Sequence, residues 1–268
     1  MLRELDLVEI GKMKAREIKD LSDQISPKEY PEFISLFSND ERKSVQNICE
    51  KLKKKLIRIQ AEEERLDLLN YYENQCYENG AVFVAGLDEV GRGPLAGPVV
   101  AAVVVLKPDA RIVGINDSKK LTEEKRQALY EIIIKEAVDY GIGMADNYEI
   151  DEHNILNATY IAMRRALDQL EVRPDCLLND AVRIPGVDTP QLPIIKGDAK
   201  SISIAAASIV AKVTRDRMMV DYDKVYPGYG FSSNKGYGTN EHYDGLRKFG
   251  RTKIHRNSFL KNFGFFVN

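Results

Sequence analysis

Residues 81–106, AVFVAGLDEVGRGPLAGPVVAAVVVL, contain the pattern that decides the fold. Residues 81–88 form a short apolar run that predicts a strand, and residues 97–106 form a continuous run rich in β-branched side chains. A run of this second kind is typical of a central strand that is buried on both faces. A glycine-rich turn separates the two runs, so the stretch predicts two strands of a buried sheet.

Short apolar runs continue to alternate with helical segments downstream. Thr122 is placed to cap a helix whose first turn holds two acids, which favour the positive end of the helix dipole. The expected buried stripe of this helix is Leu129, Ile132, Ile133 and Ala137. Further patterns predict strands at 140–146, 175–180 and 192–196, and helices at 150–170 and 200–220. Together they predict an α/β domain over residues 80–268, built on a central mixed sheet with helices on both faces.

Residues 1–79 have a different character, because they are crowded with Lys and Glu and poor in glycine. Apolar residues recur at three- and four-residue steps within residues 41–69, which predicts one face of a long helix. An earlier helix is expected over residues 2–21, and Asn79-Gly80 gives the turn signal that ends this helical extension. The basic run KLKKKLIR within the long helix would suit phosphate contacts, but AEEER follows directly, so a solvent-exposed helix with internal ion pairs is an equal alternative.

Composition excludes several classes of protein. The 268 residues carry 39 basic and 41 acidic side chains, and the net charge of −2 by itself points to no polyanionic partner. Residues 195–268 nevertheless hold 13 Lys and Arg against 6 Asp and Glu, so basic charge gathers in the C-terminal part. Three cysteines without CxxC spacing argue against a disulfide framework and against a cysteine zinc site. The chain has no apolar signal region and no run long enough for a membrane span, so we expect a cytoplasmic protein.

Four acidic residues stand at the ends of predicted strands. Asp88 and Glu89 end the first apolar run, Asp180 ends CLLND, and Asp198 follows LPIIKG at the entrance to a long helix. Groups at the strand ends of an α/β sheet converge on one crevice, and a buried carboxylate there is costly unless a cation compensates it. Solvation is the plain alternative for any one of these acids. Taken together, the four indicate a clustered carboxylate site.

Two other patterns near these acids are set aside on physical grounds. GRGPLA at 91–96 matches the dinucleotide-binding fingerprint G-x-G-x-x-A, but two prolines and a following strand leave no helix N-terminus to hold a pyrophosphate. Asp216 lies 18 residues beyond Asp198 along a mostly helical path, which separates them by about 27 Å. We expect Asp216 to pair with Lys212 on its own helix instead.

Two loops have the composition of a phosphate-binding surface. Residues 116–120, NDSKK, precede the capped helix, and residues 232–238, SSNKGYG, lie in the basic C-terminal part. Aromatic side chains among Gly and Lys are used to stack bases and contact phosphates, although packing alone also produces such loops. The aromatic residues in this part are Tyr226, Tyr229, Phe231 and Tyr237.

The sequence resembles the bacterial ribonuclease HII family, the type 2 ribonucleases H. The motifs that carry the resemblance are GLDEVGRGPLAGPVVAAVVVL, INDSKKLT, IDEHNILNATYIAMRRAL, KGDAKSISIAAASIVAKVTRDRMM, NKGYGTNEHYDGL and IHRNSF, in family order. The resemblance implies a ribonuclease H-like fold with a C-terminal helical part that binds substrate. It also implies an endonuclease that cleaves RNA in RNA–DNA hybrids. The same resemblance implies incision on the 5′ side of single ribonucleotides in duplex DNA, leaving 3′-hydroxyl and 5′-phosphate ends.

The resemblance also assigns roles to individual residues. The family's four acids correspond to Asp88, Glu89, Asp180 and Asp198, which would hold two Mg²⁺ or Mn²⁺ ions about 4 Å apart, with Asp88 as the bridging ligand. The element that senses the ribonucleotide 2′-hydroxyl corresponds to Gly91, Arg92 and Gly93. The junction-sensing tyrosine corresponds to Tyr237, and the phosphate-contacting polar residues correspond to Asn116 and Lys119.

Several alternatives stay open at this point. Successive strand residues point to opposite faces, so Asp88 and Glu89 both reach the ions only if the strand has ended or bulged there; otherwise Glu89 acts through its backbone or a water. Asn179 stands where the family more often has an apolar residue. The extension at residues 1–79 either helps to bind the duplex or only packs on the catalytic domain. We expect a monomer. The other functional hypotheses are a non-catalytic duplex-binding protein and a ribonuclease HIII-like enzyme that prefers long hybrids.

Overall fold

The structure is a computed structural model that describes residues 12–261. The chain divides into two compact units, one ending at Arg65 and the other beginning at Leu66. Helix α4 (Lys43–Leu69) contributes residues to both units. Helix α5 (Tyr71–Glu78) lies in the second unit, where it packs against the sheet. The functional boundary expected near residue 79 stays a prediction.

The first unit is a small helical assembly. It comprises α2 (Ala15–Gln24), η2 (Pro27–Glu29), α3 (Tyr30–Phe37) and most of α4. Its core is formed by Ile18, Phe33, Phe37, Val45, Cys49 and Leu52. The part of the predicted helix at 2–21 that precedes residue 12 lies outside the described residues. The sequence did not predict helix α3, whose Pro31 lies in the first turn, where a helix tolerates proline.

The second unit contains a five-stranded mixed sheet, as predicted. The strand order is β3 (Asp139–Ala145), β2 (Val99–Val105), β1 (Val84–Val90), β4 (Cys176–Asp180) and β5 (Gln191–Ile194). β1 pairs antiparallel with β2, which pairs antiparallel with β3. β1 pairs parallel with β4, which pairs parallel with β5. All seven residues of β2 are buried, which confirms that the Val-rich run forms a strand covered on both faces.

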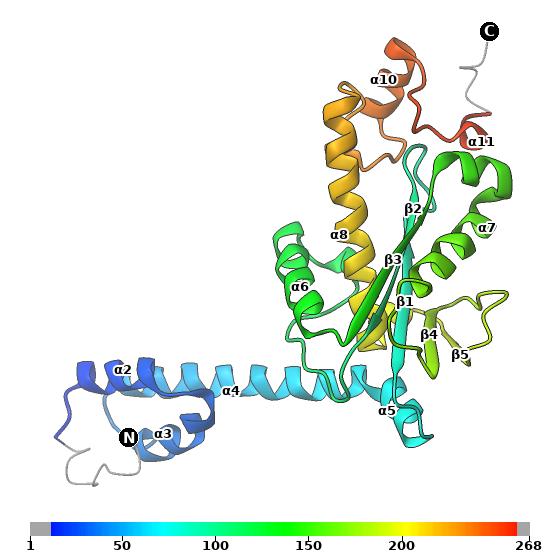
Figure 1. The fold of residues 1–268 in the computed structure, drawn as a ribbon. Helices are drawn as coiled ribbons and strands as arrows, with labels where there is room; N and C mark the ends of the chain where they lie inside the picture. Colours follow the sequence, from blue (N-terminus) through cyan, green and yellow to red (C-terminus); the bar gives the residue numbers. More distant parts are fainter. Residues whose placement is uncertain (1–11, 262–268) are drawn as a thin grey trace. The chain divides into compact units, whose positions relative to one another are not determined.

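Helices cover both faces of this sheet (Figure 1). Helices α6 (Glu123–Glu136) and α8 (Ile202–Val225) share a core with Ala102 and Val104 of β2. Helix α7 (Asn147–Leu167) shares a core on the opposite face with Ala101 and Val103. Thr122 caps α6 by accepting a hydrogen bond from the Lys125 backbone N–H at 3.3 Å, as predicted. The predicted stripe of α6 was wrong at Ile132, which is 45 % exposed, because the helix presents only a narrow face to the core.

Glycines set how closely the helices approach the sheet. A Cβ atom at Gly86 of β1 would lie 2.1 Å from the backbone carbonyl carbon of Ser203 in α8. A Cβ atom at Gly143 of β3 would lie 2.0 Å from the backbone oxygen of Ala162 in α7. Both helices therefore rest on the strand backbone itself, at distances that any larger residue would prevent.

The C-terminal part of the second unit is helical. Helices α9 (Phe231–Asn234), α10 (Asn240–Phe249) and α11 (Asn257–Leu260) follow α8. Part of the expected loop at 232–238 is thus a helical turn. Tyr229 and Phe231 are buried in the local core, so they cannot stack on bases, whereas Tyr237 is 47 % exposed. Over the described part of the chain, no helix is both long and apolar enough to cross a membrane.

Candidate active site

Two aspartates lie on one face of the sheet, and a third lies just before the helix that covers this face. β1 and β4 are parallel with Leu87 opposite Asn179, so Asp88 and Asp180 follow one position later on adjacent strands. The residues two positions before these aspartates show which helix covers this face. Gly86 packs against α8, and Leu178, which pairs with Gly86 in the sheet, packs against Ile204 of the same helix. Because alternate strand residues share a face, Asp88 and Asp180 also point toward α8. Asp198 lies in η4 (Gly197–Ala199), immediately before α8.

Glu89 belongs to the opposite face of β1. The strand continues to Val90 with regular pairing to β2, which places Glu89 opposite Ala101. Of the two alternatives for this position, the strand neither ends nor bulges at Glu89. The side chain is nonetheless held close to the sheet, where Oε1 accepts a hydrogen bond from Arg92 Nη1 at 3.1 Å. Its other oxygen, Oε2, is buried and has no hydrogen-bond partner among residues 12–261.

The carboxylates influence one another's ionisation. Burial raises the pKa of Asp88 well above its usual range, and the neighbouring charges of Glu89 and Asp180 raise it further. The backbone N–H of Glu89, 2.8 Å from Asp88 Oδ1, only partly offsets these effects. Burial also raises the pKa of Glu89, against the lowering effect of Arg92. Negative charge is thus crowded into a site that lacks enough protein donors to stabilise it.

Asp180 and Asp198 are tied together through the backbone. Asp180 Oδ1 accepts a hydrogen bond from the Gly197 N–H at 2.7 Å, so β4 fixes the position of η4. Burial raises the pKa of Asp198, and the carboxylates of Asp117 and Asp180 add to this effect. The structure therefore brings Asp198 near Asp180, and Asp180 near Asp88, as the strand-end pattern predicted.

The four acids Asp88, Glu89, Asp180 and Asp198 are called the carboxylate cluster below. The predicted phosphate-binding loop at 116–120 lies beside this cluster. Burial alone would lower the pKa of the Lys119 ammonium, but the surrounding charges of Asp198, Asp88, Asp117 and Asp180 raise it overall. The side chain of Asn116 accepts a hydrogen bond from the Asp117 N–H at 2.9 Å, which shapes the loop. The loop thus places one lysine within the electrostatic reach of three of the predicted site acids.

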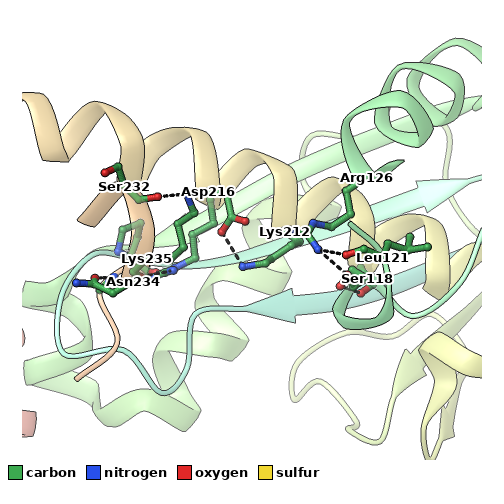
Figure 2. Close-up of polar contacts among 12 residues, drawn as sticks. Ser118, Leu121, Arg126, Lys212, Asp216, Ser232, Asn234 and Lys235 are labelled. Carbon is green, nitrogen blue, oxygen red and sulfur yellow. Dashed lines mark hydrogen bonds and ion pairs between the residues drawn. The ribbon is translucent and has the colours of Figure 1, made fainter. Parts of the chain in front are cut away.

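Contacts with α8 and α6 hold this loop in place, and Figure 2 shows those made by Arg126 of α6. The hydroxyl oxygens of Ser118, in η3 (Ser118–Lys120), and Ser208 lie 2.8 Å apart. Arg126 of α6 donates through Nη1 to the carbonyl oxygens of Ser118 and Leu121, at 3.1 and 2.5 Å. Farther along the helix, Lys212 Nζ lies 2.7 Å from Asp216 Oδ1. This confirms that Asp216 pairs on its own helix.

A fully buried arginine supports the glycine-rich turn after β1. Arg256 donates through Nη1 to the carbonyl oxygen of Arg92 at 2.9 Å and through Nη2 to that of Gly91 at 2.6 Å. The carbonyl oxygen of Gly97 accepts from Nε and Nη2 of the same guanidinium, at 3.0 and 2.8 Å. Burial lowers the pKa of Arg256 to about 9, with Arg215 contributing. One guanidinium therefore clamps three carbonyl groups of the turn.

A second buried arginine links this turn to the C-terminal loop. Arg215 of α8 donates to the carbonyl oxygens of Pro98 at 2.9 Å, Ala96 at 3.1 Å and Lys235 at 2.9 Å. Gly91 has a positive φ of 91°, and a Cβ atom there would lie 2.2 Å from Arg215 Nε. Sequence reasoning missed both arginines. The only signal for Arg215 was a charged residue continuing the apolar run IAAASIVAKVT, and Arg256 had none.

Tyr237 lies beside the turn that Arg256 supports. A Cβ atom built on Gly93 would be 3.4 Å from Tyr237 Cε1, and the Leu95 N–H donates to the Gly236 carbonyl oxygen at 2.8 Å. Residues that are 144 positions apart in the sequence, Gly93 and Tyr237, are therefore brought together as the resemblance implied. Nearby, His242 Nδ1 lies 2.9 Å from the Tyr237 carbonyl oxygen.

The site thus has two neighbouring parts. The carboxylate cluster supplies hard oxygen ligands, which suit Mg²⁺ and Mn²⁺. Among residues 12–261, no set of three or more His, Cys, Asp and Glu side chains is already arranged to hold a metal ion. The glycine-rich turn with Tyr237 supplies backbone groups and an exposed aromatic ring, a combination suited to contacting a sugar.

Comparison with known proteins connects this arrangement to one family. The family model for ribonuclease HII matches residues 85–262, and that for the ribonuclease HII N-terminal domain matches residues 14–77. A ribonuclease HII of Clostridioides difficile is 60 % identical over 92 % of this chain and 97 % of its own length. A ribonuclease HII of Lachnoclostridium phytofermentans is 55 % identical over 84 % of this chain and 88 % of its own length.

A solved structure supports the same assignment. The ribonuclease H2 of Pyrococcus horikoshii superposes with a TM-score of 0.58 and 29 % identity, over 66 % of this chain and 93 % of its own. Both the fold and the family expected from the sequence are thereby confirmed. The chain belongs to the ribonuclease HII family, endoribonucleases that act on the RNA of RNA–DNA hybrids.

Proposed function

We propose that this protein incises duplex DNA on the 5′ side of single ribonucleotides, in addition to cleaving RNA in hybrids, and leaves 3′-hydroxyl and 5′-phosphate ends. We further propose that it does so with two divalent cations, Mg²⁺ or Mn²⁺. The observation that carries this proposal is the proximity of Asp88, Asp180 and Asp198, the first two on the face of the sheet that α8 covers and the third just before that helix.

The residues present fit such ions. The donor set is made only of carboxylates, the ligands that these hard cations prefer. Burial raises the pKa values of Asp88, Glu89 and Asp198, so each carboxylate is stabilised when a cation offsets its charge. We assign the bridging position to Asp88, whose charge interacts with those of both Glu89 and Asp180. Glu89 is assigned to the opposite side of β1, where Oε2 is free to accept a cation or a water.

The cations, when bound, would promote attack by water on the phosphate and stabilise the negative charge of the leaving 3′-oxygen. The chain's own residues position the substrate. Lys119 is exposed, and its positive charge interacts with those of Asp198, Asp88 and Asp180, so we assign it, with Asn116, to the phosphate at the cut.

Selection for a ribonucleotide is assigned to the glycine-rich turn. We assign it to Gly91, Arg92 and Gly93, of which Gly93 lies beside the ring of Tyr237, while Arg256 holds the carbonyl groups of Gly91 and Arg92. A 2′-hydroxyl both donates and accepts hydrogen bonds, so rigid backbone groups can distinguish it from the hydrogen of deoxyribose. Tyr237 is exposed enough to stack on the sugar or base at the junction.

We also propose that the protein acts as a monomer in the cytoplasm. The helical extension is assigned to binding of the duplex. Support for this last assignment comes from the run of basic residues at 51–55 within α4.

The test is an incision assay with matched substrates. The full-length protein is incubated with Mg²⁺ or Mn²⁺ and a labelled DNA duplex that contains one ribonucleotide, and separately with an all-DNA duplex and a long RNA–DNA hybrid. We expect one cut 5′ of the ribonucleotide, abolished by EDTA. Asp88→Asn should lower the cleavage rate by about 10³-fold or more while duplex binding is kept. Asp216→Asn, on α8 but outside the carboxylate cluster, is the matched control and should cleave normally.

Three outcomes would contradict the proposal in different ways. Binding without cleavage of any substrate would favour a non-catalytic duplex-binding protein. Cleavage of the long hybrid alone would favour a ribonuclease HIII-like preference. Near-parental turnover by Asp88→Asn would remove this aspartate from the bridging position.

A further inference from the structure

Two of the three cysteines lie side by side. Cys76 in α5 and Cys176 in β4 are 100 residues apart in the sequence, yet their sulfur atoms are 2.9 Å apart. All three cysteines of the chain are free thiols. Helix α5 and strand β4 are in contact, so the sulfurs meet because two regular elements pack together. This proximity was not visible in the sequence, where the cysteine spacing argued against a disulfide framework.

The pair is accessible to small molecules. A surface cavity of about 380 Å³ is lined by both cysteines together with Asn79, Gly80, Ala81 and Asp175. Each cysteine is half-buried, and apolar side chains such as Val84 and Leu178 pack against the inner side of the pair. An oxidant in solution can therefore reach the sulfurs from one direction, while the core holds them in place from the other. Cys49 differs in both respects, since it is 3 % exposed in the core of the first unit and has no cysteine beside it.

We propose that Cys76 and Cys176 form a reversible disulfide on exposure to hydrogen peroxide, which makes this pair a redox modification site separate from the carboxylate cluster. In the first step, the Cys176 thiolate attacks one peroxide oxygen and breaks the O–O bond, which gives a sulfenic acid and hydroxide. In the second, the Cys76 sulfur attacks the Cys176 sulfur and expels the oxygen as water. Two thiols and one hydrogen peroxide thus give one disulfide and two waters.

The contact between the thiols also decides which sulfur reacts with the peroxide and which one resolves the sulfenic acid. The hydrogen bond that Cys76 donates lowers the pKa of Cys176, and the same hydrogen bond raises the pKa of Cys76. The thiolate is the reactive form of cysteine, so Cys176 is the sulfur that meets the peroxide and Cys76 is the one that resolves the sulfenic acid.

The disulfide would join two elements that support the carboxylate cluster. Strand β4 ends at Asp180, four residues after Cys176. Helix α5 carries Glu73, which accepts hydrogen bonds from the Ser201 hydroxyl at 2.5 Å and the Ser203 N–H at 2.9 Å, and so holds the N-terminus of α8 next to Asp198. A covalent link between α5 and β4 would constrain the unfolded chain over a long loop and leave the native contacts in place. The oxidised protein should therefore unfold at a higher temperature, by about 5 °C.

The test counts and maps the thiols of the full-length protein. The protein is treated with hydrogen peroxide, then denatured and alkylated, and its peptides are analysed with and without prior dithiothreitol. We expect a Cys76–Cys176 cross-linked peptide, loss of two hydrogen atoms in the intact mass, and alkylation of Cys49 alone. Dithiothreitol should restore three alkylated cysteines and the original unfolding temperature.

Variants keep the result interpretable. Cys49→Ser should still form the cross-link, whereas Cys76→Ser and Cys176→Ser should not, and the rise in unfolding temperature should be absent from both. The Cys76→Ser variant should instead accumulate oxidised Cys176, which mass spectrometry detects even if the variant is less stable. The proposal is overturned if the parent retains three alkylatable thiols at peroxide concentrations that oxidise Cys176 in Cys76→Ser. It is also overturned if the recovered disulfide is intermolecular or includes Cys49.

Discussion

The carboxylate cluster and the glycine-rich turn stand close together in the chain, but the protein stabilises them in opposite ways. In the cluster, Asp88 and Glu89 are buried with few donors, and Glu89 Oε2 has no hydrogen-bond partner. In the turn, the carbonyl groups of Gly91 and Arg92 are both satisfied by Arg256. The protein satisfies the turn with its own side chains, whereas the buried carboxylates have few donors.

Under the proposed function, this difference separates substrate recognition by the turn from catalysis by the carboxylates. A turn whose carbonyl groups at Gly91, Arg92 and Gly97 are held by a buried guanidinium is ordered by the protein itself, so a ligand that binds there needs to order it little further. A carboxylate cluster with uncompensated charge is less favourable on its own, and it becomes favourable only when cations bind. We therefore expect changes to the turn's support to act on stability, and changes to the cluster to act on metal response.

The largest effect is expected at Arg256. Arg256→Met removes the guanidinium donors to the carbonyl groups of Gly91, Arg92 and Gly97 and should lower the free energy of unfolding by about 3 kcal/mol or more, because buried acceptors are left unpaired. Arg256→Lys keeps a positive charge without the planar fork and should recover only part of this loss. Denaturant unfolding of both variants measures the two values.

Arg247→Met is the control for this comparison. Arg247 pairs with Asp244 on the surface of α10, where its side chain is 63 % exposed, so its loss should change stability by less than about 1 kcal/mol. Equal stability of Arg256→Met and Arg247→Met would show that the turn does not depend on the buried guanidinium.

The next effect is the pH dependence of the free energy of unfolding, which two buried histidines beside Tyr237 should produce. The Nε2 atoms of His242 and His255 lie 3.0 Å apart. Burial, with the nearby His242, lowers the pKa of His255 to about 3. The unfolded state, with a histidine pKa near 6.5, takes up the proton first as the pH falls. The contribution of His255 to the free energy of unfolding is therefore complete above about pH 6.5 and is lost progressively as the pH falls toward 3. From His255 alone, about 2 kcal/mol is lost between pH 7 and pH 5.

Unfolding free energies measured across this range check the sign. His255→Phe should remove most of this slope whatever its stability at pH 7. His153→Gln should keep the slope, because the side chain of His153 is 44 % exposed. A parental slope in His255→Phe would assign the acid sensitivity to other groups.

The smallest of the three effects is stabilisation by divalent cations. Mn²⁺ at ten times its dissociation constant should stabilise the parent by about 1.4 kcal/mol, which corresponds to a rise of about 4 °C in Tm. Asp88→Asn should lose most of this response, and Arg256→Lys should keep it. An equal response in Asp88→Asn would show that the ions bind elsewhere.

Sequence reasoning predicted the sheet and its helices well, because their signals are local. The Val-rich run of β2, the cap at Thr122 and the apolar runs before Asp88 and Asp180 each indicate their element within a few residues. The gathering of the strand-end aspartates followed from the topology that these elements imply. The roles of the candidate site residues remain proposals.

The features that were missed depend on contacts between distant residues. Arg256 reaches Gly91 across 165 positions, and Cys76 meets Cys176 across 100. Nothing in the immediate sequence of Arg256 distinguishes a buried arginine from a surface one. The same limit applies to Phe231, which lies among polar residues in the sequence but is fully buried in the structure.

Gly86 extends the comparison to mutational tolerance. The residue is two positions before Asp88, and its missing side chain lets α8 rest on the strand backbone. We expect a selection that demands only a folded protein to retain Gly86 and to tolerate substitutions of Asp88. We expect a selection for cleavage to retain both residues. Neighbouring positions of one strand therefore belong to different classes of constraint, one imposed by space and one by chemistry.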